Sequence, residues 1–429
     1  MTTTTTLSKK SNWSILQRVL FRFGFVYTIL FTFYYSFGLI PYGNYILVKR
    51  SKLTKKIVFW IEEHFVSVQH NFYPDMSVSD TTYSYLLLLS LLIISSMITV
   101  IWLVLDRKRK SYSTLLYWLK VVIRYYVALM LFKYGLGKFY HTQFPPPNIN
   151  LLLGSYGESY PMGLAWTFLG FSKGYNIFMG IAEVSALLLL YRKTAILGSL
   201  IAFAVSLNIL VINIFFDVPM KLLVIHLVLM ALFILLTKIK PLIRFFIKGE
   251  SAKLSIVDYV FIKNRKRNIS LRIGKYIIIG LVMYNSFDFP SGLRKYYDNI
   301  VKQPLYGLYD IKTLIINKDT IPPLLSNKKR WKYVDITNSN YLSFKNIDRK
   351  SNSYYKYSVD TIKKEILFKN YKDTTKVYTM NFSYKEHMFT FNTVLEKDTI
   401  IIKTKKLSKD DFTLMNKGIR WISDRPFSK

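Results

Sequence analysis

Long, mainly apolar runs alternate with short basic segments over the first two thirds of this chain. Each run is close to the 20 or so residues that a helix needs to cross a hydrocarbon core about 30 Å thick. Helices are the expected spanning element because every backbone polar group must be satisfied within the lipid. The clear runs lie at 23–40, 83–105, 115–138, 175–191, 195–216 and 221–236.

A seventh, weaker run lies at 273–287, and Pro290 and Gly292 are expected to end its helix. A short amphipathic stretch at 57–66 is expected to lie on the membrane surface. The connection at 139–173 is rich in proline, glycine and aromatic residues, and it is too apolar for an ordinary solvated loop. It is typical of an aromatic belt at the interface or of a cap over the mouth of the bundle.

From about residue 303 the pattern changes to a period of two, as in 377–382 and 389–394. Alternating apolar and polar residues, separated by clusters of Asn, Asp and Lys, predict short antiparallel strands. The predicted fold is an all-α polytopic membrane bundle of about seven transmembrane helices. A small antiparallel β domain is expected to follow it.

The chain has 60 Lys and Arg against 25 Asp and Glu, which gives a net charge of +35. A soluble protein with this balance would suggest a nucleic-acid partner, but many basic residues here flank the apolar runs, as at 106–110 and 263–267. The partner indicated is the lipid bilayer, and no nucleic acid is expected. Because cytoplasmic loops carry most Lys and Arg, we expect a bacterial inner (plasma) membrane protein with a cytoplasmic N-terminus and an extracytoplasmic C-terminal domain. That orientation requires an odd number of spans.

The sequence contains no cysteine. Disulfides, iron–sulfur clusters, thiolate zinc sites and a cysteine nucleophile are thereby excluded. No phosphate loop, catalytic triad or zinc-binding helix with two histidines is found either. The sequence therefore predicts no metal site.

Two charged residues in the predicted spans are the first candidates for chemistry. Glu183 lies in mid-span, where an ionisable residue is costly enough to indicate a functional site. Lys138 ends the third span, and Lys138 or Lys221 is the expected partner of Glu183. We predict catalytic roles for Glu183 and Lys138, and the alternative is an interhelical ion pair that holds the bundle together. Lys120 and Arg124 share the helical face of Lys138 and are interpreted as snorkelling side chains.

Other polar and aromatic residues are expected at the outer mouth of the bundle. Pro219 predicts a turn that brings Asp217 and Lys221 to facing helix ends. A lone membrane histidine such as His226 more often packs through a hydrogen bond than binds haem or a metal, so haem is not expected. The predicted ligand-binding residues are His141, Gln143, Trp166, Asn213, Asp217, Lys221 and His226.

Several of these features occur together in one known family. Gly137 and Lys138 end a span, a variable outer loop follows, 180–183 carries the mid-membrane Glu183, and a small-residue helix contains 197–199. In this order the motifs resemble the DoxX-like four-helix membrane family over roughly 115–240. The family name comes from a small subunit of a quinol oxidase system, so the resemblance implies a bundle that meets quinones or a redox partner protein. The expected domains are 1–114, a pair of transmembrane helices; 115–240, the DoxX-like core; 241–300, a basic loop and the last helix; and 301–429, the β domain.

The leading functional hypothesis is an outer-facing pocket that binds a quinone or another hydrophobic molecule as part of a membrane redox system. If the protein is an enzyme, it is expected to be a membrane oxidoreductase or a subunit of one. One alternative is a non-enzymatic scaffold that anchors the β domain. A second alternative is transport of a small solute, although no paired halves with interrupted helices are found.

Overall fold

The computed structural model describes residues 13–35, 39, 54–64, 80–251, 265–299, 303–327, 330–347, 352–371, 373 and 375–416. The chain divides into two compact units. The helical unit comprises Met1–Pro146 and Gly157–Tyr297, and the barrel unit comprises Pro147–Tyr156 and Asp298–Lys429. Each unit has its own hydrophobic core.

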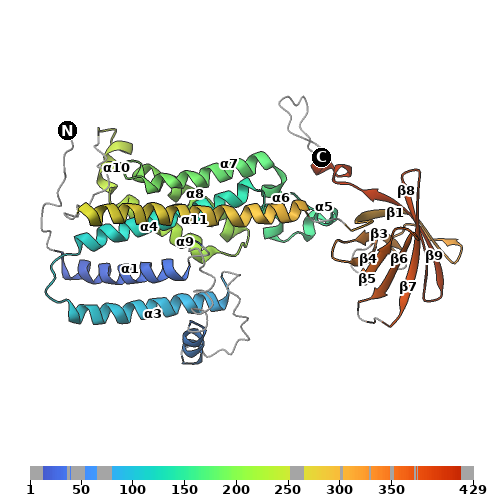
Figure 1. Ribbon diagram of the computed structural model, residues 1–429, viewed down its shortest axis with the longest axis horizontal. Helices are drawn as coiled ribbons and strands as arrows, with labels where there is room; N and C mark the ends of the chain where they lie inside the picture. Colours follow the sequence, from blue (N-terminus) through green and yellow to red (C-terminus); the bar gives the residue numbers. More distant parts are fainter. Residues whose placement is uncertain are drawn as a thin grey trace. The chain divides into compact units, whose positions relative to one another are not determined.

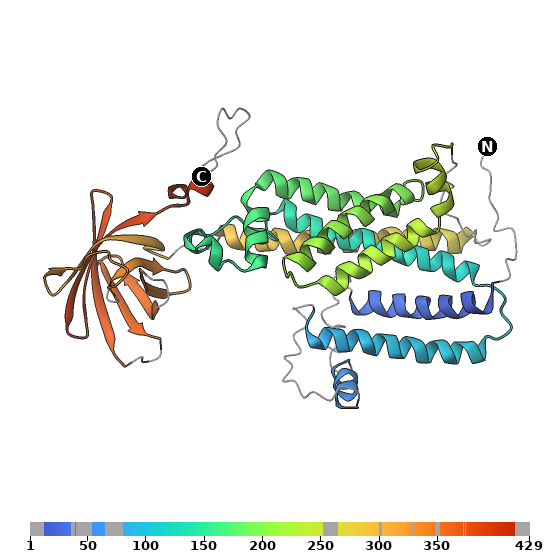
Figure 2. The same cartoon turned by 180° about the vertical axis from the view of Figure 1, so that it is seen from behind.

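Within the described residues, the helical unit contains five helices that are long and apolar enough to cross a membrane. Figures 1 and 2 show how they are arranged in the unit. A sixth crossing is possible if α9 (Lys221–Leu236) and α10 (Ile239–Phe246), which meet at an angle of 80°, form one span. The chain is therefore a multi-pass membrane protein, as its apolar runs predicted. The five helices are α1 (Ile15–Tyr34), α3 (Thr82–Leu105), α4 (Ser113–Phe139), α7 continued by η2 (Lys173–Leu190) and α8 (Ala195–Phe215).

Two helices at predicted spans differ from their predicted bounds by more than two residues. The first helix begins eight residues earlier than predicted, because Ser14 and Gln17 form a capping box at its N-terminus. The end predicted for this span, 36–40, lies largely outside the described residues. The predicted stop at Pro290 and Gly292 is wrong, because α11 (Arg265–Asn299) continues through Pro290.

A proline inside a helix removes one hydrogen bond without necessarily ending the helix. The resulting helix α11 has 35 residues, and it is not among the helices apolar enough to count as a membrane span. The seventh span therefore stays a prediction. Residues 54–64 are helical, as the amphipathic pattern indicated, whereas 65 and 66 lie outside the described residues.

The apolar connection between α4 and α7 is itself folded. It contains α5 (Ile149–Leu153), η1 (Tyr156–Glu158) and α6 (Pro161–Phe171). The segment with α5 belongs to the barrel unit, whereas α6 belongs to the helical unit.

Helix α4 is central to the helical unit and contacts α1, α7, η2, α8 and α9. It packs closely against α7, where a Cβ atom on Gly135 would lie 2.9 Å from Cγ2 of Val184 and 3.0 Å from the carbonyl oxygen of Gly180. Arg124, which is 2% exposed, donates from Nε and Nη2 to the carbonyl oxygen of Leu189 in η2, over 2.8 and 2.6 Å. The prediction that Arg124 snorkels is therefore wrong. This side chain satisfies a carbonyl near the end of η2, where helical carbonyls lack amide partners.

The C-terminal strands form one antiparallel sheet, which confirms the predicted β domain. Consecutive strands pair in order from β3 to β9, and β1 pairs with both β3 and β9, so eight strands close into a barrel. The short strand β2 pairs only with the last two residues of β1. The strands are β1 (Gly307–Ile316), β2 (Asp319–Thr320), β3 (Trp331–Ile336), β4 (Tyr341–Asn346), β5 (Asn352–Asp360), β6 (Glu365–Asn370), β7 (Val377–Lys385), β8 (Met388–Leu395) and β9 (Asp398–Leu407).

Apolar side chains fill the barrel core, and among them Leu314, Val334 and Phe391 are fully buried. This agrees with a barrel of eight strands, whose interior is just wide enough for side chains to fill. The period of two therefore separates a packed inner layer from a polar outer layer.

Two buried aspartates of the barrel unit form ion pairs with lysines that are more exposed. Asp310 is 2.6 Å from Nζ of Lys312 and 2.9 Å from Nζ of Lys332. Burial alone would raise the pKa of Asp310, but hydrogen bonds from the two lysines outweigh it and hold the pKa below the usual value. Lys345 lies 2.8 Å from Asp335 and also donates to Oδ1 of Asn150, over 2.7 Å. This last bond joins the α5 segment to the strands within the barrel unit.

Candidate functional site

The helical unit contains a cavity of about 600 Å³, which we call the bundle cavity. Side chains of α4, α6, α7, α8 and α9 line it, together with the turns that follow α4 and precede α9. Its walls are mainly apolar, with Leu131, Trp166 and Phe178 among the large side chains. The polar residues on its walls are Tyr134, Lys138, Gln143, Tyr175, Glu183, Asn208 and Asn213.

A buried ion pair lies in the wall of the bundle cavity. Nζ of Lys138, near the end of α4, is 2.6 Å from Oε1 of Glu183, near the end of α7. The two side chains are only 5% and 3% exposed. This pairing confirms Lys138, rather than Lys221, as the partner that the sequence predicted for Glu183.

Lys138 has further contacts besides the ion pair, whereas one oxygen of the Glu183 carboxylate has none among the described residues. Nζ of Lys138 also donates to Oε1 of Gln143 over 3.0 Å and lies 5.3 Å from the centre of the Phe144 ring. Oε2 of Glu183 is buried and has no hydrogen-bond partner in the described part of the chain. Since a buried carboxylate oxygen normally has a partner, Oε2 is the polar atom of the cavity that is most ready to accept a hydrogen bond from a ligand.

Local sequence explains how the pair is positioned. Gly135 and Gly180 let the two helices approach closely, as small residues do in membrane bundles. About one helical turn after each glycine, α4 carries Lys138 and α7 carries Glu183. Small residues and opposite charges at matching offsets therefore bring the two side chains together.

The structure brings five of the nine predicted site residues to the bundle cavity: Lys138, Glu183, Gln143, Trp166 and Asn213. His141 is not among the lining residues, and it occupies the turn after α4 with a φ of 56°. Burial lowers the pKa of His141, and the nearby positive charges of Arg294 and Lys173 lower it further.

Asp217 and Lys221 also lie outside the cavity lining. They form the predicted pair across the turn before α9, at 3.0 Å, and the Asp217 side chain is 84% exposed. Such an exposed pair contributes little to stability. Its position indicates a turn rather than a binding site.

His226 faces α1 instead of the cavity. Because the carbonyl oxygen of Leu222 can only accept, Nδ1 of His226 donates to it over 2.6 Å, and Nε2 of a neutral imidazole then accepts from the hydroxyl of Tyr27, also over 2.6 Å. The ring also stacks on Phe31, with 3.8 Å between centroids. His226 is therefore a packing residue that joins α9 to α1.

Asp80 is a structural residue that the sequence did not reveal. The N-cap residue of α9, Met220, has a left-handed backbone and provides no side-chain cap. The carboxylate of Asp80 accepts instead from the amides of Lys221 and Leu222, over 2.6 and 3.0 Å. No local signal could predict this cap, because Asp80 precedes Lys221 by 141 residues.

Across the described part of the chain, no group of three or more His, Asp or Glu side chains lies where it could hold a metal ion. The residues that line the bundle cavity provide an ammonium group, a carboxylate, amides and two phenols. These groups can donate and accept hydrogen bonds to the polar end of an otherwise apolar molecule.

Comparisons with known proteins give little further information. No family model and no solved structure matches the chain. The chain is 33% identical over 108 residues to a protein of Bacillus subtilis (strain 168) with the name "Uncharacterized protein YwoB", and the match covers 23% of this chain. It spans 62% of the length of that relative, whose name states no activity. The DoxX-like resemblance therefore stays a prediction.

Proposed function

We propose that the helical unit binds a hydrophobic molecule in the bundle cavity, with the polar end of the molecule at Lys138 and Glu183. One observation carries this proposal: a mainly apolar cavity of about 600 Å³ has a buried ion pair in its wall, and one carboxylate oxygen of that pair has no partner among the described residues. Ligand pockets are typically of this size and have few, convergent polar groups.

A quinone or quinol is the ligand class that fits these groups best. Oε2 of Glu183 can accept from a quinol hydroxyl, and the ammonium of Lys138 has one N–H beyond those directed to Glu183 and Gln143. That N–H can donate to a quinone carbonyl. A role in a membrane redox system also agrees with the resemblance of 115–240 to DoxX-like proteins.

The test is to purify the full chain in mild detergent and to identify lipophilic compounds that remain bound, by mass spectrometry and absorption spectroscopy. We expect a stoichiometric compound with the wild type and its loss with Glu183→Gln. Asp217→Asn is the matched control, because Asp217 is also a carboxylate but lies outside the cavity lining. Bulk phospholipid alone in all three proteins would contradict the proposal.

A scaffold function is the second candidate, and the contact between α4 and α7 favours it. The close approach at Gly135 and the ion pair of Lys138 with Glu183 both join these helices. If Glu183→Gln and Lys138→Ala both unfold the protein in detergent, and no compound binds the wild type, the pair serves the fold alone.

The proposed orientation has a cytoplasmic N-terminus and an extracytoplasmic barrel in a bacterial inner membrane. It is supported by the basic residues at 106–110 and 192–193, which follow the second and fourth predicted spans. Because the chain has no cysteine, single cysteines report without background. In intact cells an impermeant maleimide should label Lys376→Cys in the barrel but not Lys193→Cys, and the reverse result would overturn this orientation.

A further inference from the structure

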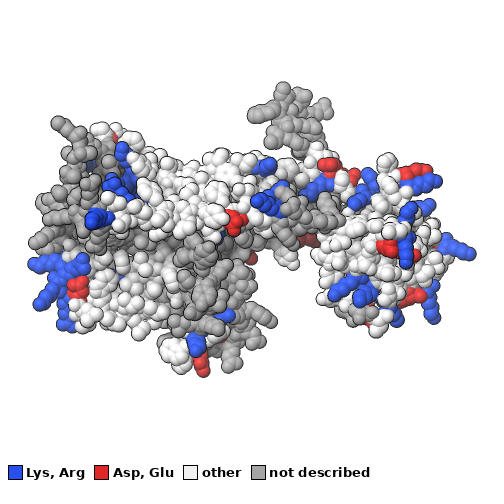
Figure 3. Space-filling model, in the orientation of Figure 1, with Lys and Arg blue, Asp and Glu red and all other residues white. Residues whose placement is uncertain are grey.

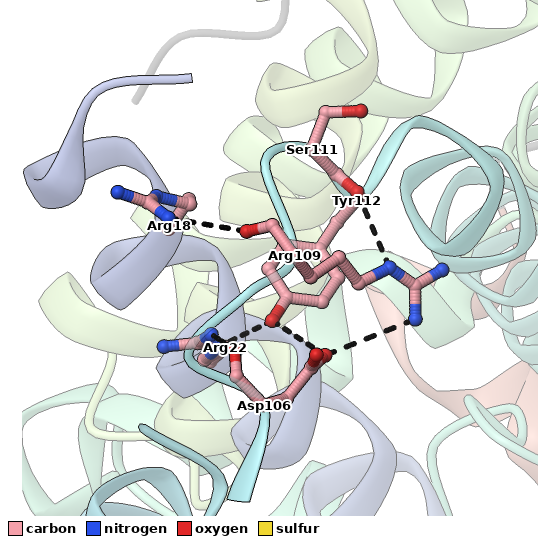
Figure 4. Close-up of polar contacts among 6 residues, drawn as sticks. All are labelled: Arg18, Arg22, Asp106, Arg109, Ser111 and Tyr112. Carbon is pink, nitrogen blue, oxygen red and sulfur yellow. Dashed lines mark hydrogen bonds and ion pairs between the residues drawn. The ribbon is translucent and has the colours of Figure 1, made fainter. Parts of the chain in front are cut away.

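Basic side chains gather at one end of the helical unit, where α1 begins and where the turn between α3 and α4 lies (Figures 3 and 4). The residues of α1 include no acid, and Asp106 is the only acid of the turn 106–112. We call this group the basic corner. Its cations are Arg18, Arg22, Arg107, Lys108, Arg109 and Lys110.

Asp106, the acid of the basic corner, forms hydrogen bonds and an ion pair with neighbouring residues (Figure 4). The hydroxyl of Tyr112 donates to Oδ2 of Asp106 over 2.9 Å. Arg22, which is 2% exposed, donates from Nε to the Tyr112 hydroxyl over 2.8 Å and from Nη2 to the backbone oxygen of Asp106 over 2.7 Å. Arg109 is 3.9 Å from the carboxylate. The acid therefore stabilises the turn and is not among the residues that line the hollow beside it.

That hollow is open to solvent and measures about 320 Å³. Its described lining residues are Trp13, Arg18, Arg107, Lys108 and Lys110, of which four are cations and none is an acid.

Two hydrogen bonds to the turn between α3 and α4 help to position residues that line the hollow. The backbone amide of Trp13 donates to the carbonyl oxygen of Lys110 over 3.1 Å, and Nη1 of Arg18 donates to that of Arg109, also over 3.1 Å. Nε of Arg18 is buried and has no acceptor among the residues that the structure describes. A guanidinium held in this way presents donors suited to a phosphate group.

We propose that this hollow binds a phosphate group, from an anionic phospholipid headgroup or from phosphate in solution. The location favours the headgroup, because the hollow adjoins the ends of α1, α3 and α4, which are long and apolar enough to span the membrane. Trp13 also has the amphipathic character typical of the headgroup level. Basic pockets next to membrane helices recognise anionic lipids through the same chemistry.

The test uses the full chain in detergent and measures binding of phosphatidylglycerol and phosphatidylcholine by native mass spectrometry. The variant is Lys108→Gln/Lys110→Gln, since both side chains are exposed and line the hollow. The matched control is Lys193→Gln/Lys248→Gln, which removes two exposed lysines that do not line it. A separate arm measures thermal stabilisation by sodium phosphate against sodium chloride of equal ionic strength.

Each basic residue near an anionic headgroup contributes about a fivefold gain in affinity. Loss of both lysines should therefore weaken phosphatidylglycerol binding roughly 25-fold, with little change for phosphatidylcholine or in the control variant. Stabilisation by sodium phosphate that is lost in the same variant, without a preference for phosphatidylglycerol, would support the site and assign it to free phosphate. Equal weakening in both variants, or no preference for either phosphate source, would overturn the proposal.

Discussion

The buried ion pair in the cavity wall allows a quantitative prediction from a double-mutant cycle. Lys138 and Glu183 are 5% and 3% exposed, so their interaction belongs to the buried class rather than the surface class. Removing one partner of a buried pair leaves an uncompensated charge and costs about 3–5 kcal/mol. We expect Lys138→Met and Glu183→Leu each to lower the free energy of unfolding by that amount.

The double variant should recover most of this loss. Replacing both members of a buried pair by apolar residues of similar volume is often neutral or stabilising, so Lys138→Met/Glu183→Leu should unfold within about 2 kcal/mol of the wild type. The assay is equilibrium unfolding in mixed micelles, followed by the helical circular dichroism signal. If each single change costs less than about 1 kcal/mol, as for a surface pair, or if the double variant is no better than the worse single one, the reasoning is refuted.

Three further predictions concern other parts of the fold. Asp80→Ala removes the cap of α9 and should cost about 1–2 kcal/mol in the same unfolding assay; an unchanged free energy would show that the cap contributes nothing. Gly170→Ala should cost about 1–3 kcal/mol, because its Cβ would lie 2.2 Å from the carbonyl oxygen of Pro145, whereas Gly163→Ala has open space and should be nearly neutral; equal effects would contradict this packing. The folded-state pKa of Asp310 is held below the unfolded value of about 3.9, so its contribution is present above that pH and is lost as the pH falls through the folded value. Asp310→Asn should therefore make the free energy of barrel unfolding depend less on pH below about 4, as measured by near-ultraviolet circular dichroism. If this pH dependence is the same in the variant and the wild type, the Asp310 ion pairs do not contribute to it.

Sequence patterns predicted the features that depend on local periodicity. Apolar runs identified the membrane helices because a span must be apolar over about 20 residues, and the period of two identified the strands because their side chains alternate between two faces. The pairing of Lys138 with Glu183 was also predictable, since a buried charge requires a partner. Closure of the barrel was not, because it depends on pairing between β1 and β9 at opposite ends of the domain.

Errors arose where tertiary contacts decide the role of a side chain. Arg124 has the spacing of a snorkelling residue, yet it reaches a carbonyl of η2. His226 lies in a helix that lines the bundle cavity, but its ring turns toward α1. Neither contact leaves a mark in the neighbouring sequence. Residue type alone can therefore identify candidate polar residues in a membrane bundle, but it does not show which neighbouring element each side chain contacts.

The barrel unit consists of two separate pieces of chain, Pro147–Tyr156 and Asp298–Lys429. A shortened protein that ends before Asp298 would keep the first piece. It would lose Lys345, the residue of β4 that donates a hydrogen bond to Asn150. Exchange of the barrel between proteins by a simple C-terminal fusion would leave the same mismatch. The barrel is thus not an appendage that can be exchanged independently of the membrane part, because its smaller piece is encoded between the two helices that carry Lys138 and Glu183.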